Sequence, residues 1–76
     1  MKELLEYLAR ELVEDPDAVE VIEKHDDRGT LLSLRVGPDD MGKVIGRGGR
    51  TARAIRSVVK VAGIRAGERV SVEIVE

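Results

Sequence analysis

The 76-residue sequence contains no cysteine and, in Tyr7, a single aromatic residue. The lack of cysteine excludes a disulfide framework, a thiolate nucleophile and a zinc site built on sulfur, so we expect a reducing, cytoplasmic environment. The lack of paired aromatic residues excludes a sheet surface on which nucleic-acid bases stack. With His25 as the only histidine, the chain also lacks a nucleophilic triad, and most classes of enzyme are excluded.

Long hydrophobic runs are absent as well, so we expect no membrane span, no secretory signal and no membrane partner. Hydrophobic residues make up 42% and charged residues 37% of the chain, which is typical of a folded domain with a heavily charged surface. A chain of this length buries only about 60% of its unfolded surface. We therefore expect one domain over residues 1–76.

Charge is distributed unevenly, although the net charge is only −2. Up to Asp40 the sequence has five basic and twelve acidic residues, a net charge of −7. Beyond Asp40 it has eight basic and three acidic residues, a net charge of +5, with Glu76 among the acids. This asymmetry indicates a polarised molecule with one face that attracts anions.

Hydrophobic periodicity predicts six elements. In chain order they are an amphipathic helix over residues 2–14, strands near 19–23 and 30–36 joined by a turn over 25–29, a short helix over 39–45, a helix from about 50 to an exit turn at 63–67, and a strand over 70–74. The predicted fold class is α+β, order α-β-β-α-α-β, with the helices covering one face of the sheet. The last helix has an apolar arc, which we expect to be buried, formed by Ala52, Ile55, Val58, Val59 and Ala62.

A glycine-rich loop lies between the two predicted central helices. Gly46 and Gly49 form a G-x-x-G motif, in which glycine permits a sharp turn and a close approach by a sugar-phosphate chain. The following helix directs its amide groups and positive dipole end at the same place. The residues thus predict an anion site at the loop, with charge supplied by Lys43, Arg47, Arg50 and Arg53. The alternative is a plain turn between helices, because eight glycines give about one such match by chance.

The run Val44-Ile-Gly-Arg-Gly-Gly-Arg50, followed by Ile55, resembles the G-x-x-G loop of KH domains. Chain length, the leucine-rich first helix, the Pro38-to-Gly46 segment and the last strand resemble the KhpA family of small bacterial KH-domain RNA-binding proteins. The resemblance implies a type II KH fold with a three-stranded mixed sheet. It also implies that the loop clamps about four nucleotides of single-stranded RNA, at the positions Gly46, Arg47, Gly48 and Gly49, with Ile45 as a wall of an apolar groove.

The same resemblance implies partners and a role. It implies a homodimer or a heterodimer with a KhpB-like protein. It also implies that the protein acts in post-transcriptional regulation or as an RNA chaperone linked to cell shape. Gly48 departs from the family pattern, in which this position more often carries a polar residue, and a third glycine raises the entropy cost of ordering the loop. The competing hypothesis is a protein assembly module in which the opening helix and a sheet edge mediate dimerisation and RNA contact is minor.

Other residues that resemble site residues have simpler explanations. Asp39 and Asp40 precede a predicted helix, so we expect them to cap it. His25 lies in a predicted turn and is expected at the surface. We therefore assign no catalytic residue, metal ligand, cofactor or small-molecule substrate, and expect a binding module that is not an enzyme.

Overall fold

The computed structural model describes residues 1–75, and Glu76 lies outside the described residues. The helices and strands are α1 (Lys2–Leu12), β1 (Glu20–Asp26), β2 (Gly29–Arg35), α2 (Met41–Ile45), α3 (Arg50–Arg65) and β3 (Val70–Ile74). Short 3-10 turns lie at Pro16–Ala18, Pro38–Asp40 and Arg47–Gly49. The predicted order α-β-β-α-α-β is confirmed.

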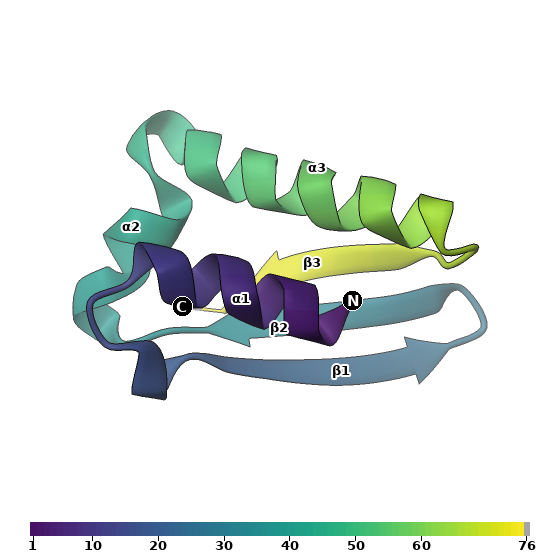
Figure 1. Ribbon diagram of the computed structural model, residues 1–76, viewed down its shortest axis with the longest axis horizontal. Coiled ribbons are helices and arrows are strands. Elements are labelled where there is room, and N and C mark those ends of the chain that lie inside the picture. Colours follow the sequence, from purple (N-terminus) through teal and green to yellow (C-terminus); the bar gives the residue numbers. More distant parts are fainter. Residues whose placement is uncertain (76) are drawn as a thin grey trace.

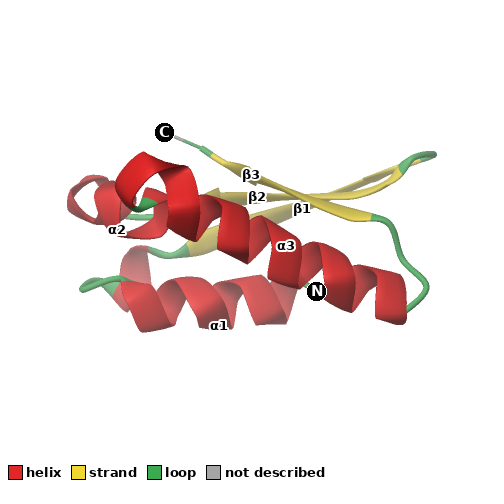
Figure 2. Cartoon of the chain, turned by 90° about the horizontal axis from the view of Figure 1, so that it is seen from above, coloured by secondary structure: helices red, strands yellow, loops and turns green. Residues whose placement is uncertain are grey.

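The sheet has the strand order β1-β2-β3 and is mixed, as predicted. β1 pairs with β2 in antiparallel orientation, whereas β2 pairs with β3 in parallel orientation. Parallel neighbours need a crossover, and α2 with α3 supplies it between β2 and β3. The helices lie on one face of the sheet, with α1 across its middle and α3 alongside β3 (Figures 1 and 2).

The core lies between this sheet face and the helices. The alternation in β2 and β3 directs one set of side chains inward, and their contacts with α1 and α3 exclude water. The largest fully buried side chains are Leu5, Leu32, Leu34, Val44 and Val59. Ile55 is also buried, as predicted. On the opposite face the buried Ser33 hydroxyl donates a hydrogen bond of 3.0 Å to Oε2 of Glu73, which links β2 to β3.

Two turns differ from the sequence prediction. The hairpin turn is shorter, because strand pairing continues to Asp26 opposite Gly29. Asp26 Oδ1 accepts hydrogen bonds from the amides of Arg28 at 2.7 Å and Gly29 at 3.2 Å, which closes the turn locally. The exit turn also begins later, since α3 continues through Gly63. A Cβ atom at Gly63 would lie 2.9 Å from Cγ2 of Val70, so this glycine permits close packing of helix on strand.

Val58 is the one member of the predicted apolar arc of α3 that the fold leaves largely open, with 48% of its surface exposed. The buried positions of α3 are instead Ala52, Ile55, Val59 and Gly63. At about 100° per residue, Val58 falls beside this face, on the flank that borders α1. The prediction that Val58 is buried was wrong because α3 packs on both β3 and α1, and the short α1 covers only part of the adjoining flank of α3.

The prediction that Asp39 and Asp40 cap a helix was also wrong. Neither the Pro38–Asp40 turn nor α2 has a side-chain cap hydrogen bond. Asp40 is buried and its carboxylate accepts hydrogen bonds from the amides of Glu14 and Asp15, both at 3.1 Å. These amides follow the end of α1, so Asp40 joins the first helix to the segment that leads into α2. Within the described residues, no helix is long and apolar enough to cross a membrane.

Candidate functional site

The loop between α2 and α3 has a backbone that glycine makes possible. Gly46 has φ 74° and ψ 173°, a region essentially limited to glycine. Gly48 (φ 64°, ψ 19°) and Gly49 (φ 76°, ψ 14°) are left-handed. The Gly46 position is also crowded, because a Cβ atom there would contact the side chain of Thr51, whereas one at Gly48 would meet nothing within 4 Å. The loop is therefore tightly packed at its first glycine and open at its tip.

α3 begins directly behind this loop. Gly49 is its N-cap residue and supplies no side-chain hydrogen bond, and the first turn contains no acidic residue. In a helix of 16 residues the first amides and the dipole favour an anion at this end. Arg47 and Arg50 are exposed there, and none of the ion pairs found within residues 1–75 involves either side chain. The loop tip thus lies at the start of α3 and combines the first amides of this helix with two arginines available to a ligand.

Arg53 belongs to the same site, but its guanidinium group is hydrogen-bonded to the loop backbone. Its Nη1 atom donates a hydrogen bond of 3.0 Å to the carbonyl oxygen of Gly48. The guanidinium group thereby spans the loop from the first turns of α3. Since a guanidinium has five N–H donors, this bond leaves others for a ligand.

Lys43 has a different environment from the other predicted cations. Its Nζ atom lies 3.1 Å from Oε1 of Glu14 and 3.4 Å from Oδ1 of Asp40. Hydrogen bonding to Glu14, together with that to Asp40, raises the pKa of Lys43 above its usual range. Lys43 thus lies beside two carboxylates. Its side chain does not line the hollow beside the loop, which is described next.

A hollow of about 220 Å³ runs from the loop toward the free edge of β3. Its lining residues are Ile45, Gly49, Ala52, Arg53, Arg56 and Ile74, and we call it the near groove. Ile45 lies in its wall, where the resemblance placed it, whereas the neighbouring Val44 is part of the core. Arg56 crosses the near groove, with its Nε atom 3.4 Å from the carbonyl oxygen of Val72 in β3.

Sequence reasoning left open whether Arg56 joins the site, and it did not assign Ala52 or Ile74 to it. The sequence does hold a signal for Arg56, which lies one turn after Arg53 on the basic side of α3. Ile74 lacks such a signal. It joins the near groove only because the crossover makes β3 an edge strand beside α3.

Comparison with known proteins agrees with this architecture. The family model described as KhpA/KhpB, KH domain, matches residues 2–74. A protein of Clostridium acetobutylicum named RNA-binding protein KhpA is 51% identical over 75 residues, covering 99% of this chain and 100% of the relative. Proteins with the same name from Streptomyces coelicolor and Aquifex aeolicus are 49% and 42% identical, covering 100% of this chain and 92% and 96% of theirs.

The fold is also similar to that of a solved structure. A variant of Era from Aquifex aeolicus, crystallised with GDP and AlF4⁻, superposes with a TM-score of 0.64 over 96% of this chain. The sequence identity is 19%, and the chain corresponds to 28% of the Era chain. At this identity the similarity concerns the fold alone.

Proposed function

Because the chain belongs to the KhpA/KhpB family of KH domains, we propose that it binds single-stranded RNA through the Gly46–Gly49 loop and the near groove. The observation that carries the proposal is the loop itself, which places Arg47 and Arg50 beside the first amides of α3. Phosphate groups of the RNA lie against these amides and guanidinium groups. No step of this binding requires a catalytic residue, so the proposed role is a binding module.

The near groove receives the bases in this proposal. Ile45, Ala52 and Ile74 offer apolar contact, and Arg56 offers a cation beside the edge of β3. Aliphatic contacts replace aromatic stacking, for which the chain has only Tyr7. Such contacts distinguish bases weakly, so sequence preference is modest. A footprint of about four nucleotides also binds weakly alone, and pairing with a second KH module increases affinity through effective concentration.

The test is a fluorescence anisotropy titration of a four-nucleotide single-stranded RNA against the native chain and an Arg47→Asp/Gly48→Asp variant. We expect salt-dependent binding by the native chain and at least a tenfold loss in the variant, about 1.4 kcal/mol. Circular dichroism verifies that both proteins are folded. If both bind equally, the loop is not the phosphate site.

The matched control is an Arg65→Asp/Gly67→Asp variant. It makes the same substitutions at an arginine and at a left-handed glycine, and Gly67, like Gly48, has φ near 70° (77° and 64°) and open space around it. Net charge changes identically, but the site is the turn after α3. We expect this variant to bind the short RNA like the native chain. An equal loss in both variants means that general charge, not the loop, determines binding.

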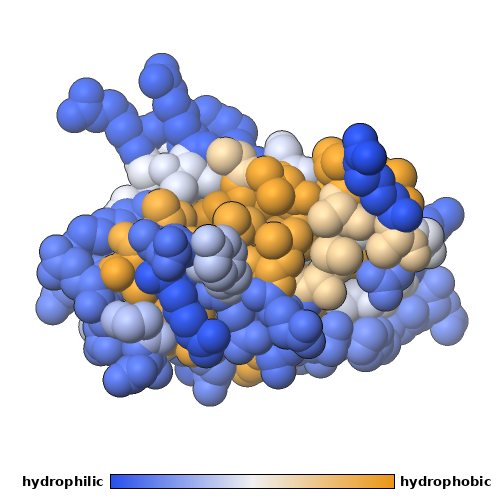
Figure 3. All heavy atoms as spheres, in the orientation of Figure 1, coloured by the Kyte–Doolittle hydropathy of each residue, from blue (hydrophilic) through white to orange (hydrophobic). Residues whose placement is uncertain are grey.

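Protein assembly is a second candidate function, supported by an apolar surface. Figure 3 shows apolar atoms gathered across the face formed by α1 and α3. On α3, Val58 and Val61 are 48% and 50% exposed, and Leu4 and Leu8 of α1 are half-buried. A second KH module of the same family, either another copy or a KhpB-like chain, is the proposed occupant. This surface lies on the helices rather than at a sheet edge.

Sedimentation of the native chain and a Val58→Lys/Val61→Glu variant tests assembly. The two substitutions leave the net charge unchanged and alter only exposed side chains. We expect self-association that the variant abolishes while tetranucleotide binding persists. A monomeric native chain that also fails to associate with a KhpB-like KH domain excludes this candidate.

A further inference from the structure

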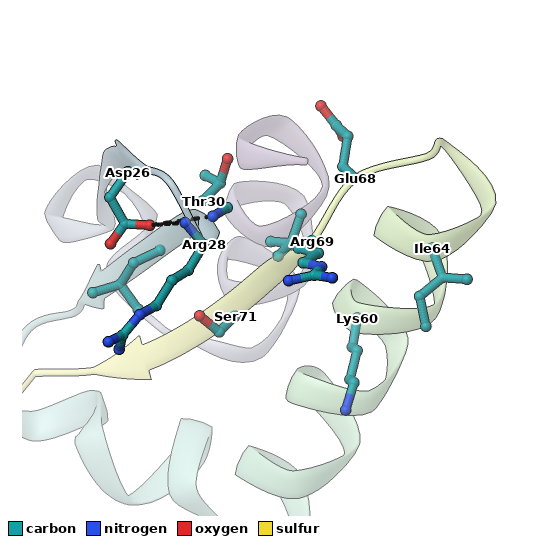
Figure 4. A pocket seen from close by; sticks show the side chains of 11 residues that line it. Asp26, Arg28, Thr30, Lys60, Ile64, Glu68, Arg69 and Ser71 are labelled. Atoms are coloured by element: carbon teal, nitrogen blue, oxygen red, sulfur yellow. Dashed lines mark hydrogen bonds between the residues drawn. The ribbon is translucent and has the colours of Figure 1, made fainter.

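A second hollow lies at the other end of the α3–β3 edge, with a volume of about 590 Å³ (Figure 4). The hairpin turn between β1 and β2, the C-terminal half of α3 and the start of β3 enclose it. We call it the far hollow. Its basic lining residues are Arg28, Lys60 and Arg69, and Ile64 and Leu31 are among its apolar lining residues.

The lining of the far hollow has three basic and two acidic residues, so positive charge is in excess. None of the ion pairs found in residues 1–75 involves Arg28, Lys60 or Arg69. The two acidic lining residues are Asp26 and Glu68. Asp26 Oδ1 accepts hydrogen bonds from the backbone amides of the hairpin turn. Figure 4 shows the carboxylate of Glu68 directed away from Arg69. The far hollow therefore has a net charge of +1 (three basic and two acidic lining residues), and its three cations have no ion pair inside residues 1–75.

One stripe of α3 connects the two hollows. Arg53 and Arg56 line the near groove, and Lys60 and Ile64 line the far hollow. Their spacing of three to four residues places all four on one side of the helix, over about 16 Å of its length. Along β3, Ile74 belongs to the near groove and Ser71 to the far hollow. The contact of Arg56 with Val72 lies between them, so the two hollows are consecutive along one edge.

We propose that the far hollow holds one or two further nucleotides of the RNA strand whose first part occupies the loop and the near groove. The guanidinium groups of Arg28 and Arg69 bind phosphate, and Ile64 and Leu31 contact a base. The continuity of the α3 stripe favours a single strand over a separate ligand, because a strand that leaves the near groove along β3 reaches the far hollow next. This inference rests on the proposed function, and it extends the footprint beyond the nucleotides held at the G-x-x-G loop.

The test compares RNA lengths in an Arg28→Ala/Arg69→Ala variant. Alanine retains the Cβ atom of Arg69, and the backbone bond from Thr30 N to Arg69 O, 2.8 Å long, does not depend on either side chain. With a four-nucleotide RNA we expect native affinity. With an eight-nucleotide RNA that contains the same four nucleotides, we expect the affinity to fall about tenfold. The slope of log K against log salt should be about 1.4 shallower, because two phosphate contacts are lost.

A Lys2→Ala/Arg10→Ala variant is the matched control, since it removes two charges from α1. We expect it to bind both RNAs like the native chain. The proposal is overturned if the Arg28/Arg69 variant loses affinity equally for both lengths, or no more than the control for the longer RNA. Binding of AMP or of an acidic peptide in the far hollow, seen by amide chemical shifts, with the longer RNA unaffected by the variant, also overturns it.

The two proposals fail in different ways. Normal tetranucleotide binding without the length-dependent difference overturns only the far hollow. Absence of any RNA binding by the native chain overturns both.

Discussion

The Nη1 atom of Arg53 donates a hydrogen bond of 3.0 Å to the carbonyl oxygen of Gly48, so a side chain of α3 holds the loop that precedes its own helix. Gly48 is left-handed, and a Cβ atom added there would meet nothing within 4 Å, so no other side chain packs on the loop tip at this position. The only other restraints found within residues 1–75 are backbone hydrogen bonds of the loop, such as that from Gly49 N to Gly46 O at 3.1 Å. Ordering a free loop costs about 1–2 kcal/mol per residue. Arg53 lowers this cost before any ligand binds.

Replacing Arg53 by lysine tests this restraint, because the substitution keeps the charge and removes the planar donor group. We expect Arg53→Lys to weaken tetranucleotide binding by about three- to tenfold, the worth of one hydrogen bond. Arg65→Lys, which alters an exposed side chain in the last turn of α3 without a hydrogen bond inside residues 1–75, should change affinity less than about twofold. Hydrogen exchange of the Gly48 and Gly49 amides should accelerate only in Arg53→Lys. Equal effects of the two substitutions would show that Arg53 acts through charge alone.

The glycines of the loop should differ in their tolerance of alanine. At Gly46 the backbone lies in a glycine-only region and a Cβ atom would contact Thr51, so strain and overpacking add. We expect Gly46→Ala to lower the free energy of unfolding by about 2–4 kcal/mol. At Gly48 only the left-handed φ opposes alanine, and we expect about 1 kcal/mol. Urea unfolding followed by circular dichroism measures both, and similar losses would contradict the packing seen at Thr51.

Asp40 should contribute to stability through its negative charge. Its carboxylate accepts two backbone hydrogen bonds from Glu14 and Asp15 and lies near Lys43. An Asp40→Asn variant keeps one acceptor oxygen and turns a donor toward the other amide. We expect it to unfold at a clearly lower urea concentration at pH 7, while Asp39→Asn, at an exposed residue, remains close to the native chain.

The stability difference between the native chain and Asp40→Asn should change with pH in one predictable direction. The backbone hydrogen bond from Glu14, opposed by burial and assisted by the Asp15 amide and Lys43, holds the pKa of Asp40 below its ordinary value of 3.8. A depressed pKa in the folded state stabilises the protein above the unfolded pKa and ceases to do so as pH falls through the folded pKa. The stability difference between native chain and Asp40→Asn should therefore be constant well above pH 3.8 and shrink below it. A difference that stays constant down to the acid transition would contradict this role.

The sequence predicts well what depends on neighbours along the chain. The amphipathic pattern of α3 indicates its length within a few residues, and the alternation of Val70, Val72 and Ile74 indicates the last strand. The motif of Gly46 and Gly49 indicates a sharp turn because its requirement for positive φ is local. These features need no knowledge of which elements pack together.

Features that depend on distant partners could not be predicted. Asp40 resembles a helix cap by position, but its partners are the amides of Glu14 and Asp15, 26 and 25 residues earlier in the segment that follows α1. Lys43 resembles a phosphate ligand until the fold brings Glu14 within 3.1 Å. Both sets of contacts have one origin, which is the packing of the segment after α1 against the segment before α2.

Salt dependence should separate the two parts of the proposed site. Arg47→Ala removes a charge at the loop tip, so the slope of log K against log salt should become about 0.7 shallower, the value for one phosphate of a single strand. Ile45→Ala removes an apolar wall of the near groove. It should weaken tetranucleotide binding by about three- to tenfold with an unchanged slope, because loss of apolar area releases no counterions.

Anisotropy titrations at several salt concentrations give both slopes. Since Ile45 also packs against the core, urea unfolding must verify that the alanine variant remains folded at the titration temperature. A shallower slope for Ile45→Ala would mean that phosphate rather than a base occupies the near groove, and the strand would then run past α3 with its bases turned outward. An unchanged slope for Arg47→Ala would instead assign the phosphate contacts to the amides of the loop and to Arg50, because those groups would bind the backbone without this side chain.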